Sequence, residues 1–73
     1  MNHDLGTFLK NARLRENLTL QEVADMAQTS KSYVHEIEAG KSVPSLLIAA
    51  RLSMALDVSV SSMAAHLLKG QPK

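Results

Sequence analysis

The chain has 73 residues, a formal net charge of +1 and no cysteine. This length supports one small domain that buries about 60% of its unfolded surface, and the lack of cysteine excludes disulfides and thiolate metal sites. The sequence contains no apolar run long enough for a membrane helix, and its first residues lack the basic and apolar regions of a signal peptide. We therefore expect a cytoplasmic protein with no membrane partner.

The spacing of the apolar residues predicts helices throughout. The expected ranges are 4–16, 20–27, 31–38, 46–56 and 60–69. We expect one all-α domain over residues 1–70, followed by a frayed tail at 71–73.

The segment from Thr19 onward carries signals for two consecutive helices. Thr19 can accept a hydrogen bond from a backbone N–H, and Glu22 stands three residues later to complete a capping box. Ser30 caps the following segment in the same way, and Gly40 can end it in a left-handed conformation. Because the break between the two segments is very short, the helices must meet at a sharp angle. This order predicts a helix-turn-helix within residues 19–44.

The second of these helices has two different faces. Val34 and Ile37 lie on one apolar stripe that can pack against the domain. The side chains that point away from this stripe belong to Lys31, Ser32, His35 and Glu36. One face is therefore free to bind something outside the domain.

This pattern resembles the Cro and lambda-repressor type of helix-turn-helix, the XRE family, over nearly the whole chain. The matching positions are Leu5, Gly6, Arg13, the runs LTLQEVA and SKSYVHEIEAGK, Pro44, Leu46, Leu52, Leu56 and Val58. The resemblance implies a compact five-helix, lambda-repressor-like fold whose second helix-turn-helix segment lies in the DNA major groove. It also implies a transcriptional regulator, most simply a repressor that binds a palindromic double-stranded operator as a homodimer.

By the same resemblance, base edges are contacted by Lys31, Ser32, His35 and Glu36. Lys31 can donate to guanine, Ser32 can bind either type of base, and Glu36 can accept from the cytosine amine. Alternatives stay open for Glu36, which can pair with Lys31 or face solvent, and for His35, which can contact a phosphate or remain solvated.

Phosphate contacts fix the register of a protein on DNA without carrying sequence information. The expected residues are Gln21, Ser30, Tyr33, Lys41 and Ser42. The loop at Lys41 and Ser42 is expected to expose its amides before a helix N-terminus, which favours anions. For Tyr33 the alternative is a ring packed against the first helix. Family members prefer a DNA-anchoring glutamine directly after the residue that matches Thr19, whereas this chain has Leu20, so Gln21 is the replacement candidate.

Arg13 and Glu38 match a pair that forms a partly buried salt bridge in the family. We expect this pair to tie the first helix to the end of the base-reading helix, a structural role. The alternative is an exposed pair that contributes little to stability.

The predicted fourth helix is unusually apolar. Its family core positions match Leu46, Ala49, Leu52 and Leu56, and further apolar residues stand where the family usually has polar ones. Contiguous exposed apolar residues indicate an interface. The expected dimer contacts are Leu47, Ile48, Met54, Met63 and Leu67. The alternative is that the fifth helix folds over the fourth and buries these residues within one chain.

Other classes of function are less consistent with the sequence. His3, His35 and His66 lie on separate elements without the spacing of a metal motif, so we expect no enzyme activity, no metal and no cofactor. We also expect no small-molecule ligand, because one small domain leaves no room for a separate ligand-binding domain. The stronger rival is a protein-interaction module, antitoxin-like or an adaptor, that docks through the apolar patch of the fourth helix. The choice among phage repressor, restriction-modification controller, antitoxin and plasmid regulator stays open.

Overall fold

The computed structural model describes residues 3–70, and all the regular structure in this range is helical. The helices are α1 (His3–Arg15), α2 (Leu20–Ala27), α3 (Lys31–Glu38), α4 (Leu46–Leu56) and α5 (Val60–Lys69). The bounds of α2 to α5 agree with the prediction, and α1 begins and ends one residue earlier than expected. The predicted fraying of residues 71–73 lies outside the described residues.

Side-chain caps explain why the helices begin where they do. The Thr19 hydroxyl accepts from the Glu22 amide at 3.0 Å, and the Glu22 carboxylate accepts from the Thr19 amide at 2.8 Å, which completes the predicted capping box. Serines cap α3, α4 and α5 by accepting from the amide three residues later. Each cap satisfies a backbone donor that has no partner within the helix.

The end of α3 is formed by Gly40, which has a φ of 80°. This left-handed conformation lets the Lys41 amide donate to the Glu36 carbonyl at 2.9 Å. Glycine adopts such a φ without the steric cost that a side chain adds. The predicted role of Gly40 at the end of this helix is confirmed.

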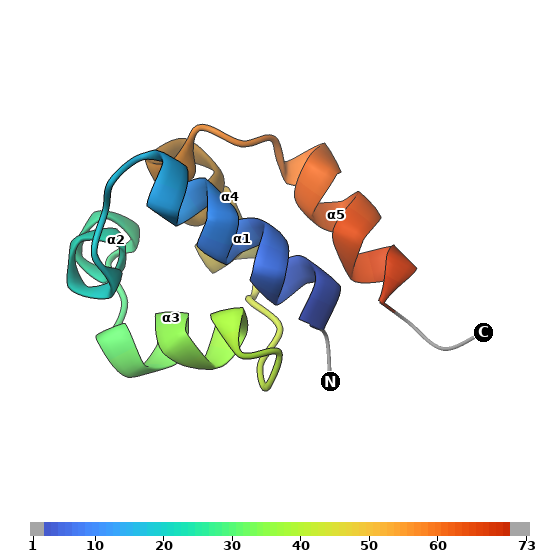
Figure 1. The fold of residues 1–73 in the computed structure, drawn as a ribbon, viewed down its shortest axis with the longest axis horizontal. Helices are drawn as coiled ribbons and strands as arrows, with labels where there is room; N and C mark the ends of the chain where they lie inside the picture. The colour runs from blue at the N-terminus through green and yellow to red at the C-terminus, as the bar shows by residue number, and fades with distance from the viewer. Residues whose placement is uncertain (1–2, 71–73) are drawn as a thin grey trace.

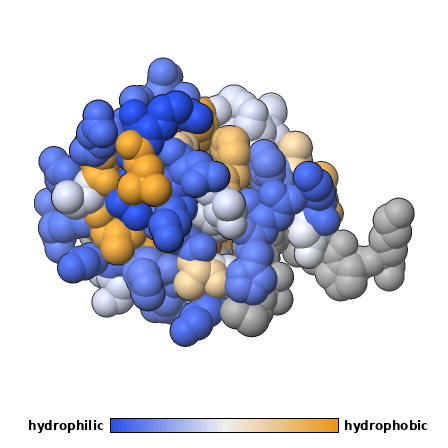
Figure 2. All heavy atoms as spheres, in the orientation of Figure 1, coloured by the Kyte–Doolittle hydropathy of each residue, from blue (hydrophilic) through white to orange (hydrophobic). Residues whose placement is uncertain are grey.

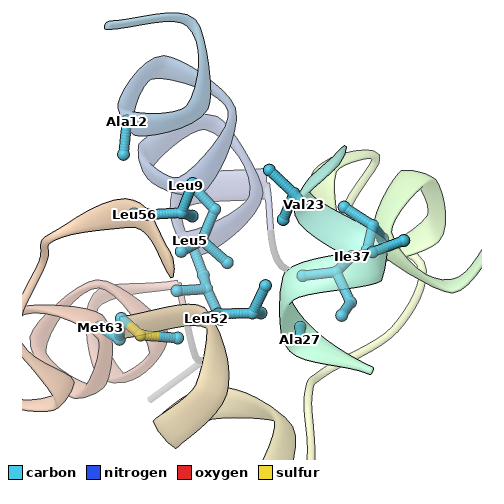
Figure 3. Close-up of a cluster of buried hydrophobic side chains, with 11 residues drawn as sticks. Leu5, Leu9, Ala12, Val23, Ala27, Ile37, Leu52, Leu56 and Met63 are labelled. Carbon is cyan, nitrogen blue, oxygen red and sulfur yellow. The ribbon is translucent and has the colours of Figure 1, made fainter. Parts of the chain in front are cut away.

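α1 is central to the fold, as Figure 1 shows: it crosses in front of α4, with α2 and α3 on one side and α5 on the other. α5 packs mainly against α1. The core, most of which is labelled in Figure 3, consists of Leu5, Leu9, Ala12, Val23, Ala24, Ala27, Val34, Ile37, Leu52, Leu56 and Met63. All five helices contribute to this one cluster.

Two expectations about the apolar residues of α4 and α5 were wrong. Leu46 was expected in the core but is 79% exposed, because it is the first residue of α4 and lies at the rim of a groove beside α5 rather than under α1. Met63 was expected at a dimer interface but is 3% exposed, because the packing of α5 on α1 directs it into the core. Met63 is therefore buried within a single chain, which was the alternative to a dimer contact.

Polar contacts also join α5 to α1. The His66 Nδ1 atom lies 2.8 Å from Oδ1 of Asp4, and the Lys69 Nζ atom lies 3.8 Å from its Oδ2. The imidazole of His66 stacks on the ring of Phe8 with a centroid distance of 4.2 Å. These contacts hold the last helix against the first turns of α1.

Among the described residues, no single helix is both long and apolar enough to cross a membrane. α4 and α5 meet the length and composition criteria only when taken together, and the chain bends by 118° between them.

Candidate nucleic-acid interface

The turn between α2 and α3 is made by three residues. Gln28 adopts a left-handed conformation with a φ of 56°, and the next amide, that of Thr29, donates to the Ala24 carbonyl at 2.9 Å. Ser30 then caps α3 by accepting from the Tyr33 amide at 3.1 Å. The short turn confirms the helix-turn-helix pattern, although nothing in the sequence singled out Gln28 as the left-handed residue.

α3 is held by its apolar stripe and presents its polar stripe to solvent. Val34 and Ile37 are 3% and 1% exposed. The side chains of the four predicted base-contacting residues, Lys31, Ser32, His35 and Glu36, are all exposed. Figure 2 shows hydrophilic residues along the side of the molecule on which α3 lies. The structure therefore places these four residues on an accessible face of one rigid helix.

The far end of α3 is fixed by the ion pair that the sequence predicted. The Arg13 Nε atom lies 2.8 Å from Glu38 Oε2, Nη2 lies 3.1 Å from Oε1, and Nη1 donates to the Leu18 carbonyl at 2.9 Å. The two side chains are only 10% and 7% exposed, so this is a buried, bidentate pair and not an exposed one. The hydrogen bonds that the Arg13 guanidinium donates to Glu38 raise the pKa of Arg13, and the Coulomb attraction between the two groups adds to this effect, while burial opposes it.

Three of the predicted base-contacting residues share an open depression at the other end of α3. Its lining consists of Leu20, Lys31, Ser32 and His35. Among the described residues, the three polar side chains of this depression have no hydrogen-bond or ion-pair partner. They are therefore available for an external ligand. The sequence identified Leu20 as part of the apolar face of α2 and as a departure from the family pattern, but not as part of this surface.

Glu36 contacts Ser42 and not Lys31, the partner that the sequence suggested. Its Oε2 atom accepts from the Ser42 hydroxyl at 3.3 Å. No pairing with Lys31 occurs within the described part of the chain. The contact ties the loop that follows α3 back to the exposed face of α3.

The predicted phosphate-contacting residues lie in several local environments. Lys41 is exposed, but its amide already closes the end of α3, so the expectation of an exposed amide at this residue was wrong. Tyr33 is half-buried against the core, and its hydroxyl donates to the Val43 carbonyl at 3.4 Å. Gln21 donates to Asp25 on its own helix at 2.9 Å. Ser30 is occupied as a helix cap.

The predicted dimer contacts are not all equally accessible. Leu47 and Met54 are 59% and 85% exposed, whereas Ile48 and Leu67 are half-buried against the core. Exposed Leu46 borders an apolar groove between α4 and α5, and Met54 borders a second depression beside α2. α4 therefore presents two separate apolar edges.

Comparisons with known proteins agree with this architecture. The family model described as "Helix-turn-helix" matches residues 9–62. The transcriptional regulator ClgR of Mycobacterium tuberculosis is 37% identical over 57 residues, which are 78% of this chain and 51% of that protein. The chain thus spans about half the length of this relative.

Solved structures show the same arrangement of helices. The regulator of clp genes ClgR from Corynebacterium glutamicum superposes with a TM-score of 0.81 at 28% identity, over 93% of this chain and 72% of that one. The N-terminal DNA-binding domain of SinR from Bacillus subtilis superposes with a TM-score of 0.79 at 33% identity, over 85% and 91% of the two chains. A structure of SinR in complex with DNA matches with a TM-score of 0.77. Together with the helix-turn-helix geometry of α2 and α3, these matches show that the chain belongs to the XRE-type helix-turn-helix family.

Proposed function

We propose that this chain is a transcriptional regulator that binds specific double-stranded DNA by placing α3 in the major groove. The observation that carries the proposal is the exposed polar face of α3, on which side chains of mixed hydrogen-bonding capacity, without partners in the described part of the chain, stand side by side. Base edges in the major groove present distinct patterns of donors and acceptors. A rigid helix with such a face can distinguish them.

The assignment of roles follows the position of each residue. Lys31, Ser32 and His35 contact base edges from the depression at the start of α3, and Glu36 accepts from a cytosine amine beside them. The carboxylate of Glu36 also accepts a hydrogen bond from the hydroxyl of Ser42. This hydrogen bond limits the rotation of both side chains. The similarity in fold and sequence to SinR, which has been solved with DNA, supports this assignment.

Phosphate contacts come from the surroundings of α3. Lys41 is an exposed cation directly after the helix, and Gln21 and Ser30 carry donors near the same elements. Ser42 can donate to a phosphate only if its hydroxyl exchanges the contact with Glu36 for one with DNA. Tyr33 can reach a phosphate only if its hydroxyl exchanges the weak contact with Val43 for one with DNA. The net charge of +1 means that one copy neutralises few phosphates, so its affinity should be modest.

A homodimer would double these contacts, and we propose that it forms through the apolar edge of α4 that faces α5. Of the expected dimer contacts, Leu67 lines this edge, whereas Met54 lines the other edge and is left out of the proposed interface. This groove is lined mainly by aliphatic side chains, and Leu46 protrudes at its rim. From Val60 to Leu68, α5 has no Asp, Glu, Lys or Arg, so no charge repulsion opposes a second copy. A two-fold dimer of this kind pairs the same patch with itself and binds a palindrome whose half-sites are about one helical turn apart.

Repression is the proposed outcome of operator binding, because the chain resembles the Cro and lambda-repressor type. A DNA target also implies the cytoplasm of a prokaryotic cell as the place of action. The first relative is itself named a transcriptional regulator.

A second candidate function is docking of a protein on the other apolar edge of α4. Met26, Arg51, Met54 and Ala55 line a depression there, and the described residues offer Arg51 no carboxylate partner. An acidic, apolar segment of another protein would fit this surface. Such binding would respond weakly to salt, whereas binding to DNA falls steeply as salt rises.

The experiment that tests the main proposal is a selection of bound sequences from a randomised double-stranded DNA pool at two salt concentrations. We expect enrichment of a palindrome, with weaker retention at the higher salt. The absence of any enriched sequence at either salt would reject specific DNA binding and favour the docking function.

A further inference from the structure

Leu20 is the one apolar member of the depression at the start of α3. It is the first residue of α2 and is half-buried against the core. Its remaining surface faces the depression that it shares with Lys31, Ser32 and His35. Because Leu20 is held by the core on one side, it forms a fixed apolar wall beside three polar side chains that have no partner within residues 3–70.

An apolar wall at this place does not suit a phosphate. A leucine offers no donor to a phosphate oxygen, and bringing a charged group against it removes water without replacing the lost hydrogen bonds. The base edges of the major groove carry only one apolar group, the C5 methyl of thymine. The same methyl group is present on 5-methylcytosine.

We propose that this depression binds the C5 methyl group of a pyrimidine, with Leu20 as the apolar contact. This inference rests on the proposed function, because it requires α3 to lie in the major groove. Next to its methyl group, thymine carries the O4 acceptor, whereas cytosine carries an amine donor at the corresponding place. The cationic donor of Lys31 and the hydroxyl of Ser32 match the thymine acceptor. Thymine is therefore the preferred base, and Leu20 is a residue that determines specificity.

The test uses the full chain and the operator obtained by selection. Each thymine is replaced in turn by deoxyuridine, which removes only the methyl group and keeps every hydrogen-bonding atom. We expect one position in each half-site at which this change weakens binding about fourfold, the effect of exposing one methyl-sized group to water. The other thymines should show little change.

Variants of the protein assign the effect to Leu20. The Leu20→Gln variant should bind thymine and deoxyuridine operators equally well at that position. Met26 is on the same helix, is 52% exposed and lies outside the depression, so Met26→Gln is the matched control and should keep the discrimination. Circular dichroism of both variants should show the helical content of the unaltered protein.

A further arm distinguishes the two sources of the methyl group. At the sensitive position, the A·T pair is replaced by a G·C pair with cytosine or with 5-methylcytosine. Because Lys31 and Ser32 match thymine O4, we expect 5-methylcytosine to bind more tightly than cytosine but more weakly than thymine. Full recovery would overturn the preference for thymine, and no gain on methylation would overturn the contact with the methyl group at this position.

The inference is overturned if no thymine discriminates, or if Leu20→Gln discriminates as well as the unaltered protein. In either case a salt-sensitive, sequence-specific complex would leave the proposed function intact. Failure to select any operator would overturn the proposed function and the inference together.

Discussion

Gly6 of α1 lies directly against the backbone carbonyl of Glu38 at the end of α3. A Cβ atom at position 6 would be 2.4 Å from the Glu38 oxygen and 2.7 Å from that of Ile37. Both obstacles are backbone atoms, so a side-chain rotation cannot relieve the contact. The absence of a side chain at this position sets how closely α1 and α3 approach.

We predict that Gly6→Ala destabilises the domain, although alanine is favoured over glycine by about 1 kcal/mol in an unconstrained helix. Overpacking of this kind costs about 1–3 kcal/mol, and here it moves the two helices apart. Urea unfolding followed by circular dichroism measures the change. Gly70→Ala is the control. Gly70 has a φ of −81°, which alanine adopts without strain, so the stability of this variant should be nearly unchanged. Equal stability of the two variants would contradict the close approach.

The ion pair between Arg13 and Glu38 should be essential for folding stability. Replacing Glu38 with glutamine leaves a buried guanidinium without a carboxylate, and such a loss costs about 3–5 kcal/mol. Because Glu38 raises the pKa of Arg13, the contribution of Arg13 is present below its unfolded-state pKa and is lost only as the pH rises through the higher folded-state value. In the variant, which lacks Glu38, Arg13 still stays protonated at moderate alkaline pH because arginine is a very strong base. The stability lost by Glu38→Gln should not be regained there. A loss below about 1 kcal/mol would instead match an exposed pair.

Base contacts and phosphate contacts should differ in their effect on specificity. Lys31→Ala and Ser32→Ala should change which bases are preferred in a selected pool. Lys41→Ala should weaken binding to all sequences alike and, because a bound dimer loses two phosphate contacts, reduce the dependence of log affinity on log salt by about 1.8. Quantitative binding to a panel of single-base operator variants separates these effects. If all three variants weaken every operator equally, the base-contacting roles of Lys31 and Ser32 are wrong.

The two apolar edges of α4 can be separated by matched substitutions. Leu46 and Met54 are 79% and 85% exposed on the same helix, so a glutamate at either site should leave the fold intact. We predict that Leu46→Glu gives monomers with weaker operator binding, whereas Met54→Glu remains dimeric. Sedimentation equilibrium measures the mass in solution. If Met54→Glu were monomeric and Leu46→Glu dimeric, the dimer interface would lie at the edge of α4 beside α2.

The contact between Asp4 and His66 should contribute modestly to the docking of α5. Both side chains are about a third exposed, and pairs of this kind contribute about 0.2–1 kcal/mol. A double-mutant cycle with Asp4→Asn and His66→Gln isolates the coupling between them. We expect a small positive coupling and a lower melting temperature in each variant. Strict additivity of the two changes would show that the pair contributes nothing beyond its separate contacts.

The positions of α2 to α5 could be predicted from the sequence because their causes are local. Thr19, Ser30, Ser45 and Ser59 each cap a helix through an amide three residues away, and Gly40 ends α3 through its own backbone conformation. Such signals act within one turn of helix. The exposed polar face of α3 follows from the same short-range periodicity.

Apart from the Arg13–Glu38 pair, which the family resemblance implied, contacts between distant residues were decided only by the tertiary structure. The sequence did not show that Leu46 is exposed while Met63 is buried, since both are apolar and the difference depends on where α5 packs against α1. Nor did it show that Leu20 shares a depression with the start of α3, or that Ser42 binds Glu36. The periodicity of a helix shows which residues share a face, but the angle and distance at which helices pack decide what that face meets.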